Sequence, residues 1–440
     1  MKVAELFVKA LENEGVEYVF GVPGEENLDL LDALRQSTQI TFVLTRHEQA
    51  AGFMAATVGR LTGKPGVALS TLGPGATNLM TATAYSQLGA MPALFITGQK
   101  PIRKSKQGRF QIIDAVSMFR PLTKFSHQIV NGSNTAVHVR EAFKQAVTER
   151  PGAVHLELPE DVAAEEVLEE QAVALPYERL RRPIPEDKAI ARAVTMLEAA
   201  KHPVIVVGAG SNRKQVRKML TAFIEKTNIP FVATQMGKGV VNENLSSYLG
   251  TATLSKGDAV HEAIDCADLI INIGHDVIEK PPFIMRPTDT RQVIHMDFSP
   301  AVVDAIYFPH HEVIGDIGNA LWQLGEKITT QSTWDMTPFS SAREQTEQYL
   351  QAIPPHTKVP LAPQRIIQDI RATLSEKDIV TLDNGMYKLW FSRFYRTAHP
   401  NSLLLDNALA TMGAGVPAPI AATILRPDCT VVAVTGDGGF

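Results

Sequence analysis

Cysteine is scarce in this sequence: only Cys266 and Cys429 occur among its 440 residues, and they lie far apart. This scarcity excludes a disulfide-stapled secreted fold and a zinc site made of clustered cysteines. It is typical of proteins in the reducing cytoplasm, where we therefore expect this chain.

Long apolar runs are missing too. No stretch approaches the roughly eighteen consecutive apolar residues that would indicate a membrane-spanning helix, so we expect no membrane segment. At the N-terminus, Val3, Leu6 and Phe7 fall on one helical stripe beside several glutamates. This pattern predicts a helix of the fold and not a signal peptide.

A strong excess of charge is also absent. Lys and Arg total 42, Asp and Glu total 47, and the net charge is −5. Because no basic block is present to bind phosphate, we do not expect nucleic acid as the main partner. The 45% apolar and 20% charged residues are ordinary globular usage. The length is that of about three domains.

The N-terminal part of the chain alternates short aliphatic runs with helix-length amphipathic segments. The runs are EYVFGV, ITFVLT, GVALSTL, PALFITG and AVHLELP. Because they are apolar on both faces, they predict buried strands of a parallel sheet. Segments 48–61 and 76–88 have helical spacing and would supply the crossovers that parallel strands require. We therefore expect an α/β domain over residues 1–165, followed by a charged linker to about residue 185.

Two further strand series follow. PVIVVGAG, PFVATQ, ADLIINIG and RQVIHMD, with a helix expected over 212–227, predict a second α/β domain over residues 186–326. The third unit, 358–440, contains DIVTLDNG, SLLLDN, a helix expected over 411–425 and a strand before GDGGF. The fold class expected is α/β, with three doubly wound parallel-sheet domains. Because the sequence stops just after a strand, we interpret the third domain as incomplete.

Three motifs of the first domain follow predicted strands: GVPG, RHEQAAGFMA and STLGPGATN. In open α/β sheets, the carboxyl edge of the strands is where ligands bind. Glu48 falls in the first turn of a helix, where a carboxylate could simply complement the helix dipole. A functional interpretation is favoured because Glu48 shares its domain with two glycine turns, one of which would let the backbone approach a ligand closely.

Two motifs near the C-terminus admit both a structural and a functional interpretation. VTGDGGF could be a tight turn, or its glycines could expose N–H groups to a diphosphate while Asp437 binds Mg²⁺. In ATMGAGVPAP, Met412 could fill a core or form an apolar wedge under a ligand. VVGAGSNR does not complete a dinucleotide fingerprint, because its third glycine position is Arg213.

Taken together, motifs along the whole chain resemble those of the thiamine-diphosphate enzymes of the acetolactate synthase type, catalytic (large) subunit. The motifs are GVPGEENLDLL, RHEQAAGFMA, STLGPGATN, the pair Phe110 and Gln111, PGAVHLELPEDV, ATMGAGVPAPI and GDGGF. The resemblance implies an N-terminal pyrimidine-binding domain, a central Rossmann-like domain and a C-terminal diphosphate-binding domain. It also implies a homodimer or homotetramer in which the first and last domains meet across a subunit interface.

The resemblance assigns roles to individual residues. Glu48 would hydrogen-bond the cofactor pyrimidine, and Gln111 would lie near the reacting carbon and stabilise developing oxyanions. Met412 would hold the cofactor in its bent shape, and Asp437 would bind Mg²⁺, although the family's second metal ligand lies beyond this sequence. The other residues assigned to cofactor binding are Gly24, Asn78, Gly385, Met386, Tyr387, Gly413, Gly436 and Gly438.

The implied reaction is decarboxylation of pyruvate and its addition to a second 2-oxo acid, giving 2-acetolactate. GHDVIEKPP and MDFSPAVVDAIYFP are closer to the FAD-independent, catabolic branch, so FAD is not favoured. Glu48 argues against glyoxylate carboligases, which carry an apolar residue there. Two alternatives stay open: a decarboxylase of another 2-oxo acid or an acyl-CoA, and a non-catalytic truncated paralogue. The sequence gives no indication of a regulatory small subunit.

Overall fold

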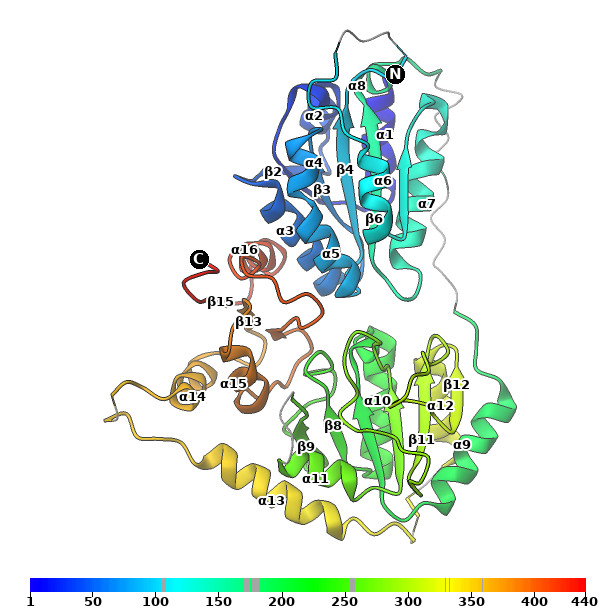
Figure 1. Cartoon of the computed structure of the whole chain (residues 1–440), viewed down its shortest axis with the longest axis vertical. Coiled ribbons are helices and arrows are strands. Elements are labelled where there is room, and N and C mark those ends of the chain that lie inside the picture. The colour runs from blue at the N-terminus through cyan, green and yellow to red at the C-terminus, as the bar shows by residue number, and fades with distance from the viewer. Residues whose placement is uncertain are drawn as a thin grey trace. The chain divides into compact units, whose positions relative to one another are not determined.

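The computed structural model describes residues 1–103, 108–168, 175, 182–253, 258–328, 330–331, 333–357 and 359–440. Strands in these ranges form three sheets in which all the strand pairings are parallel (Figure 1). The chain divides into two compact units, which are described separately. Unit 1 comprises Met1–Leu180, Ala408–Asp428 and Asp437–Phe440, and unit 2 comprises Arg181–Asn407 and Cys429–Gly436.

The sheet of unit 1 has six strands in the order β2-β1-β3-β4-β6-β5. The strands are β1 (Tyr18–Gly21), β2 (Thr41–Leu44), β3 (Gly66–Ser70), β4 (Ala93–Gln99), β5 (Phe125–Gln128) and β6 (Ala153–Pro159). β3, β4 and β6 are buried along their whole length, as their apolar sequences predict. For β2 the prediction of burial was wrong, because β2 is an edge strand and Leu44 at its end is 59% exposed.

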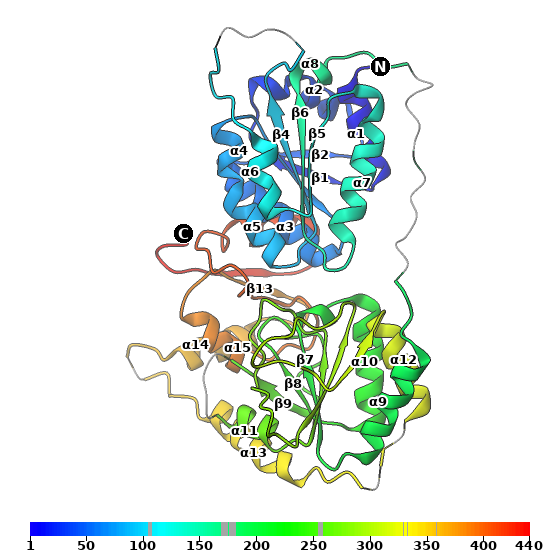
Figure 2. The same ribbon diagram turned by 45° about the vertical axis from the view of Figure 1, so that its right-hand side comes forward.

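Helices cover both faces of this sheet (Figures 1 and 2). Residues of α1 (Val3–Asn13), α2 (Leu28–Gln36), α7 (Thr135–Val147) and α8 (Glu160–Ala163) pack with one face. Residues of α3 (Glu48–Thr62), α5 (Met80–Leu88), α6 (Ala115–Phe119) and α16 (Pro417–Leu425) pack with the other. The sheet is therefore doubly wound, and the prediction for its fold class is confirmed.

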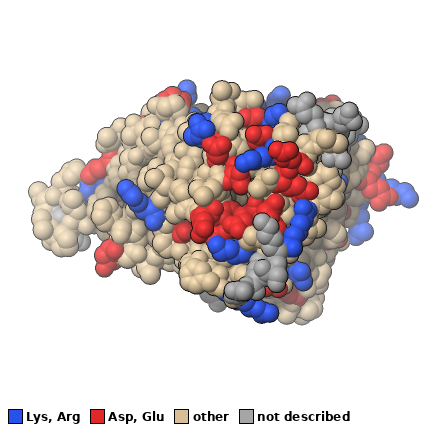
Figure 3. Space-filling view, turned by 90° about the horizontal axis from the view of Figure 1, so that it is seen from above, with Lys and Arg blue, Asp and Glu red and all other residues tan. Residues whose placement is uncertain are grey.

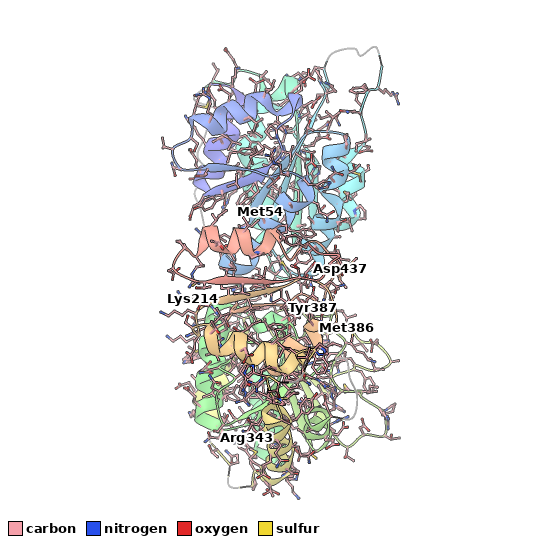
Figure 4. The ribbon with its side chains drawn as sticks, turned by 90° about the vertical axis from the view of Figure 1, so that its left-hand side faces the viewer. Met54, Lys214, Arg343, Met386, Tyr387 and Asp437 are labelled. Carbon is pink, nitrogen blue, oxygen red and sulfur yellow. The ribbon has the colours of Figure 1, made fainter. Side chains whose placement is uncertain are left out.

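Helix α16 reaches the core of unit 1 from far along the chain. It packs against α3, and Figure 4 shows Met54 of α3 beside α16. Ala414 and Ala421 share a buried cluster with Ala51 and Met54. The small side chains of Ala51 in α3 and Ala421 in α16 let the two helices lie close together.

The larger sheet of unit 2 has six strands in the order β12-β11-β10-β7-β8-β9. The strands are β7 (Pro203–Val207), β8 (Phe231–Ala233), β9 (Tyr248–Thr251), β10 (Leu269–Ile273), β11 (Gln292–Asp297) and β12 (His311–Ile314). Helices α9 (Asp187–Ala199), α10 (Lys214–Thr227) and α12 (Ile317–Lys327) pack on one face, and α11 (Ala259–Asp265) and α13 (Thr337–Gln351) on the other. The strand order reverses between β7 and β10, so the crevice that such folds use for ligands lies there.

The smaller sheet of unit 2 has three strands in the order β14-β13-β15. They are β13 (Ile379–Leu382), β14 (Leu403–Leu404) and β15 (Val431–Val434), with α14 (Pro363–Thr373) and α15 (Tyr387–Phe394) packed beside them. The fold class is thus three parallel-sheet α/β domains, as expected. The three-domain boundaries 1–165, 186–326 and 358–440 stay a prediction.

Three predicted helices have different starts in the structure. The helix expected over 411–425 begins only at Pro417. Gly413 has a φ of 97°, which a right-handed helix cannot contain, while proline suits a first helical turn because it lacks an N–H. The helix expected over 76–88 is two helices, α4 (Pro74–Asn78) and α5, that meet at Leu79. The helix expected from residue 212 begins at Lys214.

None of the helices in the described part of the chain combines the length and the apolar character needed to cross a membrane.

Candidate functional site

Glu48 is the first residue of α3 and the most informative of the predicted site residues. His47 caps the helix, because its Nδ1 accepts a hydrogen bond from the Gln49 amide at 3.1 Å. The Glu48 side chain is only 8% exposed, and Asn78 Nδ2 donates to its Oε2 at 2.9 Å. The structure therefore confirms the predicted helix start and joins two predicted site residues through one hydrogen bond.

The other carboxylate oxygen of Glu48 lies beside the turn that joins β3 to α4. A β-carbon at Gly75 would lie 3.3 Å from Glu48 Oε1 and 3.0 Å from Thr71 Cγ2. A β-carbon at Gly24 would lie 2.4 Å from Thr71 Cβ, far inside contact distance. Glycine at both positions thus keeps the backbone close to Thr71 and leaves space beside the buried carboxylate.

Sequence reasoning missed an ion pair behind this turn. The Lys100 ammonium lies 2.7 Å from Glu26 Oε1, and the Thr71 hydroxyl donates to the other oxygen of Glu26. Glu26 is 7% exposed; burial alone would raise its pKa, but the hydrogen bonds from Lys100 and Thr71 hold the pKa of Glu26 below its usual range. The signal was that Glu26 follows Gly24 by two residues, at the end of a strand.

Acidic side chains gather on the end of unit 1 where β4 and β6 finish (Figure 3). Glu25 has a 79% exposed side chain and lies 3.8 Å from the Lys100 ammonium. Burial raises the pKa of Glu160, and although Lys100 opposes this, Glu26 and Glu25 add to the increase. Lys100 therefore offsets part of a locally negative surface.

Gln111 lies against Gly73, in the turn that precedes α4 and Gly75. Its backbone is left-handed, with a φ of 57°, and its side chain is exposed. A β-carbon at Gly73 would lie 2.9 Å from both Cβ and the carbonyl oxygen of Gln111. Gln111 thus lies directly against the turn that borders Glu48.

Met412, Gly413 and Gly438 form a second group within unit 1. Met412 is 58% exposed, and its Sδ would lie 2.9 Å from a β-carbon at Gly438. A β-carbon at Gly413 would lie 3.8 Å from Nε2 of Gln49, the residue after Glu48. The structure therefore brings the Met412 loop to the start of the helix that carries Glu48.

Gly385, Met386, Tyr387 and Gly436 lie together in unit 2. Met386 and Tyr387 stand at the start of α15, and Met386 is 72% exposed (Figure 4). A β-carbon at Gly385 would overlap the Tyr387 ring at 2.4 Å, and one at Gly436 would lie 3.7 Å from it. Burial raises the pKa of Tyr387, and the Asp383 carboxylate adds to this increase. This group frames the carboxyl ends of β13 and β15.

Asp437 follows Gly436 and is exposed (Figure 4). Across the described residues, no cluster of three or more His, Cys, Asp or Glu side chains could enclose a metal ion. Asp437 is the predicted metal ligand that the structure leaves accessible.

The glycine turn of the central sheet does not resemble a phosphate cradle. Gly208 N donates to the Ile273 carbonyl at 2.9 Å, and Gly210 N donates to the Gly274 carbonyl at 2.9 Å. Ser211 N donates within the turn, to the Gly208 carbonyl, at 3.1 Å. These amides hold two neighbouring loops together, so they are not directed at a bound phosphate.

Three models of known protein families match successive parts of the chain. Residues 1–118 match the thiamine pyrophosphate enzyme N-terminal TPP binding domain, residues 190–324 the central domain, and residues 383–440 the C-terminal TPP binding domain. Thiamine pyrophosphate, or TPP, is the same compound as thiamine diphosphate. The matched order is the order in which the three sheets occur.

Relatives that align with nearly the whole of this chain point to the same kind of enzyme. A probable acetolactate synthase large subunit of Methanocaldococcus jannaschii is 33% identical, over 100% of this chain and 76% of the relative. The acetolactate synthase of Bacillus subtilis is 33% identical, over 99% of this chain and 77% of the relative. The acetolactate synthase isozyme 1 large subunit of Escherichia coli is 32% identical, over 99% and 77% respectively. The similarity covers the Glu48 turn, the Met412 loop and the GDG segment alike, and the chain belongs to the acetolactate synthase family of thiamine-diphosphate-dependent enzymes.

Proposed function

We propose that this enzyme decarboxylates pyruvate and joins the remaining two-carbon unit to a second 2-oxo acid; with two pyruvates, the products are 2-acetolactate and CO₂. The observation that carries the proposal is the buried carboxyl of Glu48, placed at a helix start, held by Asn78 and bordered by glycine. The similarity to acetolactate synthases along the chain supports the same reaction class.

When bound, thiamine diphosphate supplies an acidic thiazolium carbon and a positively charged nitrogen that acts as an electron sink. The residues around Glu48 fit its aminopyrimidine ring, because a β-carbon at Gly75 would fill the space next to the carboxyl. Glu48 would hold a proton between its Oε1 and a ring nitrogen. Asn78 would fix the orientation of the carboxyl through its 2.9 Å hydrogen bond to Oε2, and Gly24 would line the same space.

The remaining site residues would bind and orient the reacting groups. Gln111, exposed beside the Gly73 turn, would donate a hydrogen bond to oxygens that gain negative charge. Met412, with its thioether against Gly438, would support the cofactor through an apolar contact. Both side chains are exposed enough to meet a ligand.

Diphosphate and metal binding are proposed for residues at the strand ends of the third sheet and for residues of the Met412 loop and the C-terminal segment of unit 1. The residues are Gly385, Met386, Tyr387, Gly413, Gly436 and Gly438, with Asp437 as a carboxylate ligand of Mg²⁺. Strand-end glycines permit close approach of backbone N–H groups to phosphate oxygens. One carboxylate suffices for Mg²⁺ when the diphosphate itself supplies further oxygen ligands.

We further propose that the enzyme works without FAD. The support is the central glycine turn, in which the amides of Gly208 and Gly210 donate to the adjacent loop. Flavin absorbance that stays with the protein through gel filtration after incubation with FAD would contradict this.

We also propose that the protein is a homo-oligomer and that it is cytoplasmic. Large apolar side chains of unit 1, among them Leu28 (62%) and Leu44 (59%), are exposed in a way that suits a subunit interface. Cys266 and Cys429 are not joined in a disulfide with each other, as suits a reducing compartment. Light scattering that gives the mass of one chain would refute the oligomer, and labelling that places the protein outside the cytoplasm would refute the location.

The deciding experiment measures acetolactate from pyruvate in the full-length protein with thiamine diphosphate and Mg²⁺. A panel of other 2-oxo acids and acyl-CoA substrates, run in parallel, distinguishes this reaction from a related decarboxylation. Acetolactate as the main product supports the proposal. Preference for another substrate by more than about tenfold in kcat/KM, or no turnover of any substrate, refutes it.

A further inference from the structure

Strands β4, β6 and β5 of unit 1 carry two rows of buried polar side chains on one face. In the first row, His155 of β6 lies between Thr97 of β4 and Ser126 of β5, with 2.9 Å from Nε2 to the threonine and 2.9 Å from Nδ1 to the serine hydroxyl. The second row is two residues further along, so strand alternation returns it to the same face. It lies at the carboxyl end of the strands.

Glu157 is the centre of this second row. It is 2% exposed, and in the register of the sheet it is paired with Gln128 of β5. Gln99 Nε2 donates to Glu157 Oε2 at 3.0 Å, and Gln128 Nε2 donates to Oε1. A carboxylate so deeply buried needs such donors, because water cannot reach it.

Gln99 makes two further hydrogen bonds besides the one to Glu157. Gln99 is the last residue of β4 and is 5% exposed. Its Nε2 also donates to the Ile113 carbonyl at 3.2 Å, while its Oε1 accepts from the Lys100 amide at 3.0 Å. The amide orientation is fixed by chemistry, since the reverse orientation would turn Oε1 toward the Glu157 carboxylate.

The segment fastened in this way is the one that presents Gln111. Lys100 is the first residue after β4, and Ile113 is two residues after Gln111. One buried side chain therefore contacts the backbone of both Lys100, just after β4, and Ile113, two residues after Gln111. Gln111 itself lies in a left-handed conformation against Gly73, so its placement depends on how the backbone on either side is held.

We propose that Gln99, supported by Glu157, is a positioning residue that holds Gln111 in register with the Gly73 turn. This inference rests on the proposed function for what Gln111 does, but the fastening itself is independent of it. Sequence patterns did not reveal Gln99, because it ends an otherwise apolar strand. Glu157 was not singled out either, because the run AVHLELP that contains it was interpreted only as a buried strand.

The test compares Gln99→Met with Gln128→Met in the full-length enzyme with thiamine diphosphate and Mg²⁺. Both variants remove one amide donor from Glu157, but only Gln99→Met also removes the side-chain bonds to Lys100 N and to the Ile113 carbonyl, which keeps its bond from Ala115 N. We expect Gln99→Met to lower kcat by roughly tenfold to a hundredfold, with KM for pyruvate and cofactor affinity within about twofold of wild type. Gln128→Met should keep kcat within about twofold.

Two further measurements keep the inference falsifiable. In a Gln111→Ala background, Gln99→Met should have little additional effect on kcat, because the residue it positions is gone. Additive losses, or equal losses from Gln99→Met and Gln128→Met, would overturn the positioning role. Hydrogen exchange is the readout without turnover: amides 108–115 should exchange faster in Gln99→Met than in Gln128→Met.

The two proposals fail in distinguishable ways. If wild type makes no acetolactate, the proposed function fails, and exchange at 108–115 still decides whether Gln99 fastens the segment. If acetolactate is made but exchange is the same in both variants, the fastening is refuted and the proposed function stands.

Discussion

Replacing Glu48 by glutamine separates the chemistry of this carboxyl from its contribution to stability. The amide is nearly the same size, and its carbonyl oxygen can still accept the 2.9 Å hydrogen bond from Asn78 Nδ2. Hydrogen bonds to a charged group contribute about 1.5–3 kcal/mol, against about 0.5–1.5 kcal/mol for neutral ones. We therefore expect a loss of about 1 kcal/mol in the free energy of unfolding, which leaves the protein folded.

The expected effect on the reaction is larger. Proton transfer by a positioned side chain typically contributes 10²- to 10⁴-fold, or about 2.7–5.4 kcal/mol in activation free energy. Glu48→Gln should thus reduce acetolactate formation at least about a hundredfold. It should also slow exchange of the thiazolium proton for deuterium in bound cofactor, which NMR follows without turnover.

Glu14→Gln is the matched control. Glu14 is also 8% exposed, but its carboxylate is bound by Arg140 at 2.7 and 2.6 Å. The Arg140 side chain that remains is 20% exposed, so losing these charge-assisted hydrogen bonds should cost roughly 1–3 kcal/mol, at least as much as Glu48→Gln. Its rate, measured while circular dichroism shows it folded, should match wild type. A rate for Glu48→Gln within about threefold of wild type would refute the role of this carboxyl.

Three other predictions concern Gly75, His155 and Lys238. Gly75→Ala places a β-carbon 3.3 Å from Glu48 Oε1, so cofactor affinity, titrated by fluorescence, should fall roughly ten- to a hundredfold; an unchanged affinity counts against the site. Burial lowers the pKa of His155 to about 3. As the pH falls below about 6.5, the imidazole of His155 therefore becomes protonated in the unfolded chain but stays neutral in the folded protein. Stability in urea should drop by roughly 2 kcal/mol from pH 6.5 to 5, and less in His155→Gln; equal drops would contradict this. Lys238→Met leaves Glu243, with a 0% exposed side chain, without its counter-charge and should cost about 3–5 kcal/mol, partly recovered by adding Glu243→Gln.

The architecture was predictable because its signals are local. Aliphatic runs such as GVALS and ALFITGQ form fully buried strands, and alternation with helices requires a parallel sheet. Glu48 could be placed at a helix start for the same reason, because capping depends on neighbouring residues. Helix starts at prolines and at positive φ were less predictable, as the segment before Pro417 shows.

The parts of the site that sequence reasoning missed depend on tertiary contacts. Glu26 and Lys100 are separated by four α-helices (α2, α3, α4 and α5) and three strands (β2, β3 and β4), and only the sheet order brings their charges together. Gln99 ends an apolar strand, and nothing nearby in the sequence marks Ile113 as its partner. Such pairings require the fold first, because residues on neighbouring parallel strands can be far apart in the chain.

The packing of α16 against α3 has a consequence for how this protein folds during translation. Ala421 completes a buried cluster with Ala51, yet the ribosome synthesises the whole of residues 181–407 between the two halves of unit 1. At about 5–20 residues per second, the outer face of α3 stays uncovered for roughly twenty to seventy seconds while the chain from Ala51 to Ala421 is translated. The nascent N-terminal half is therefore a natural client for chaperones until its last helix emerges.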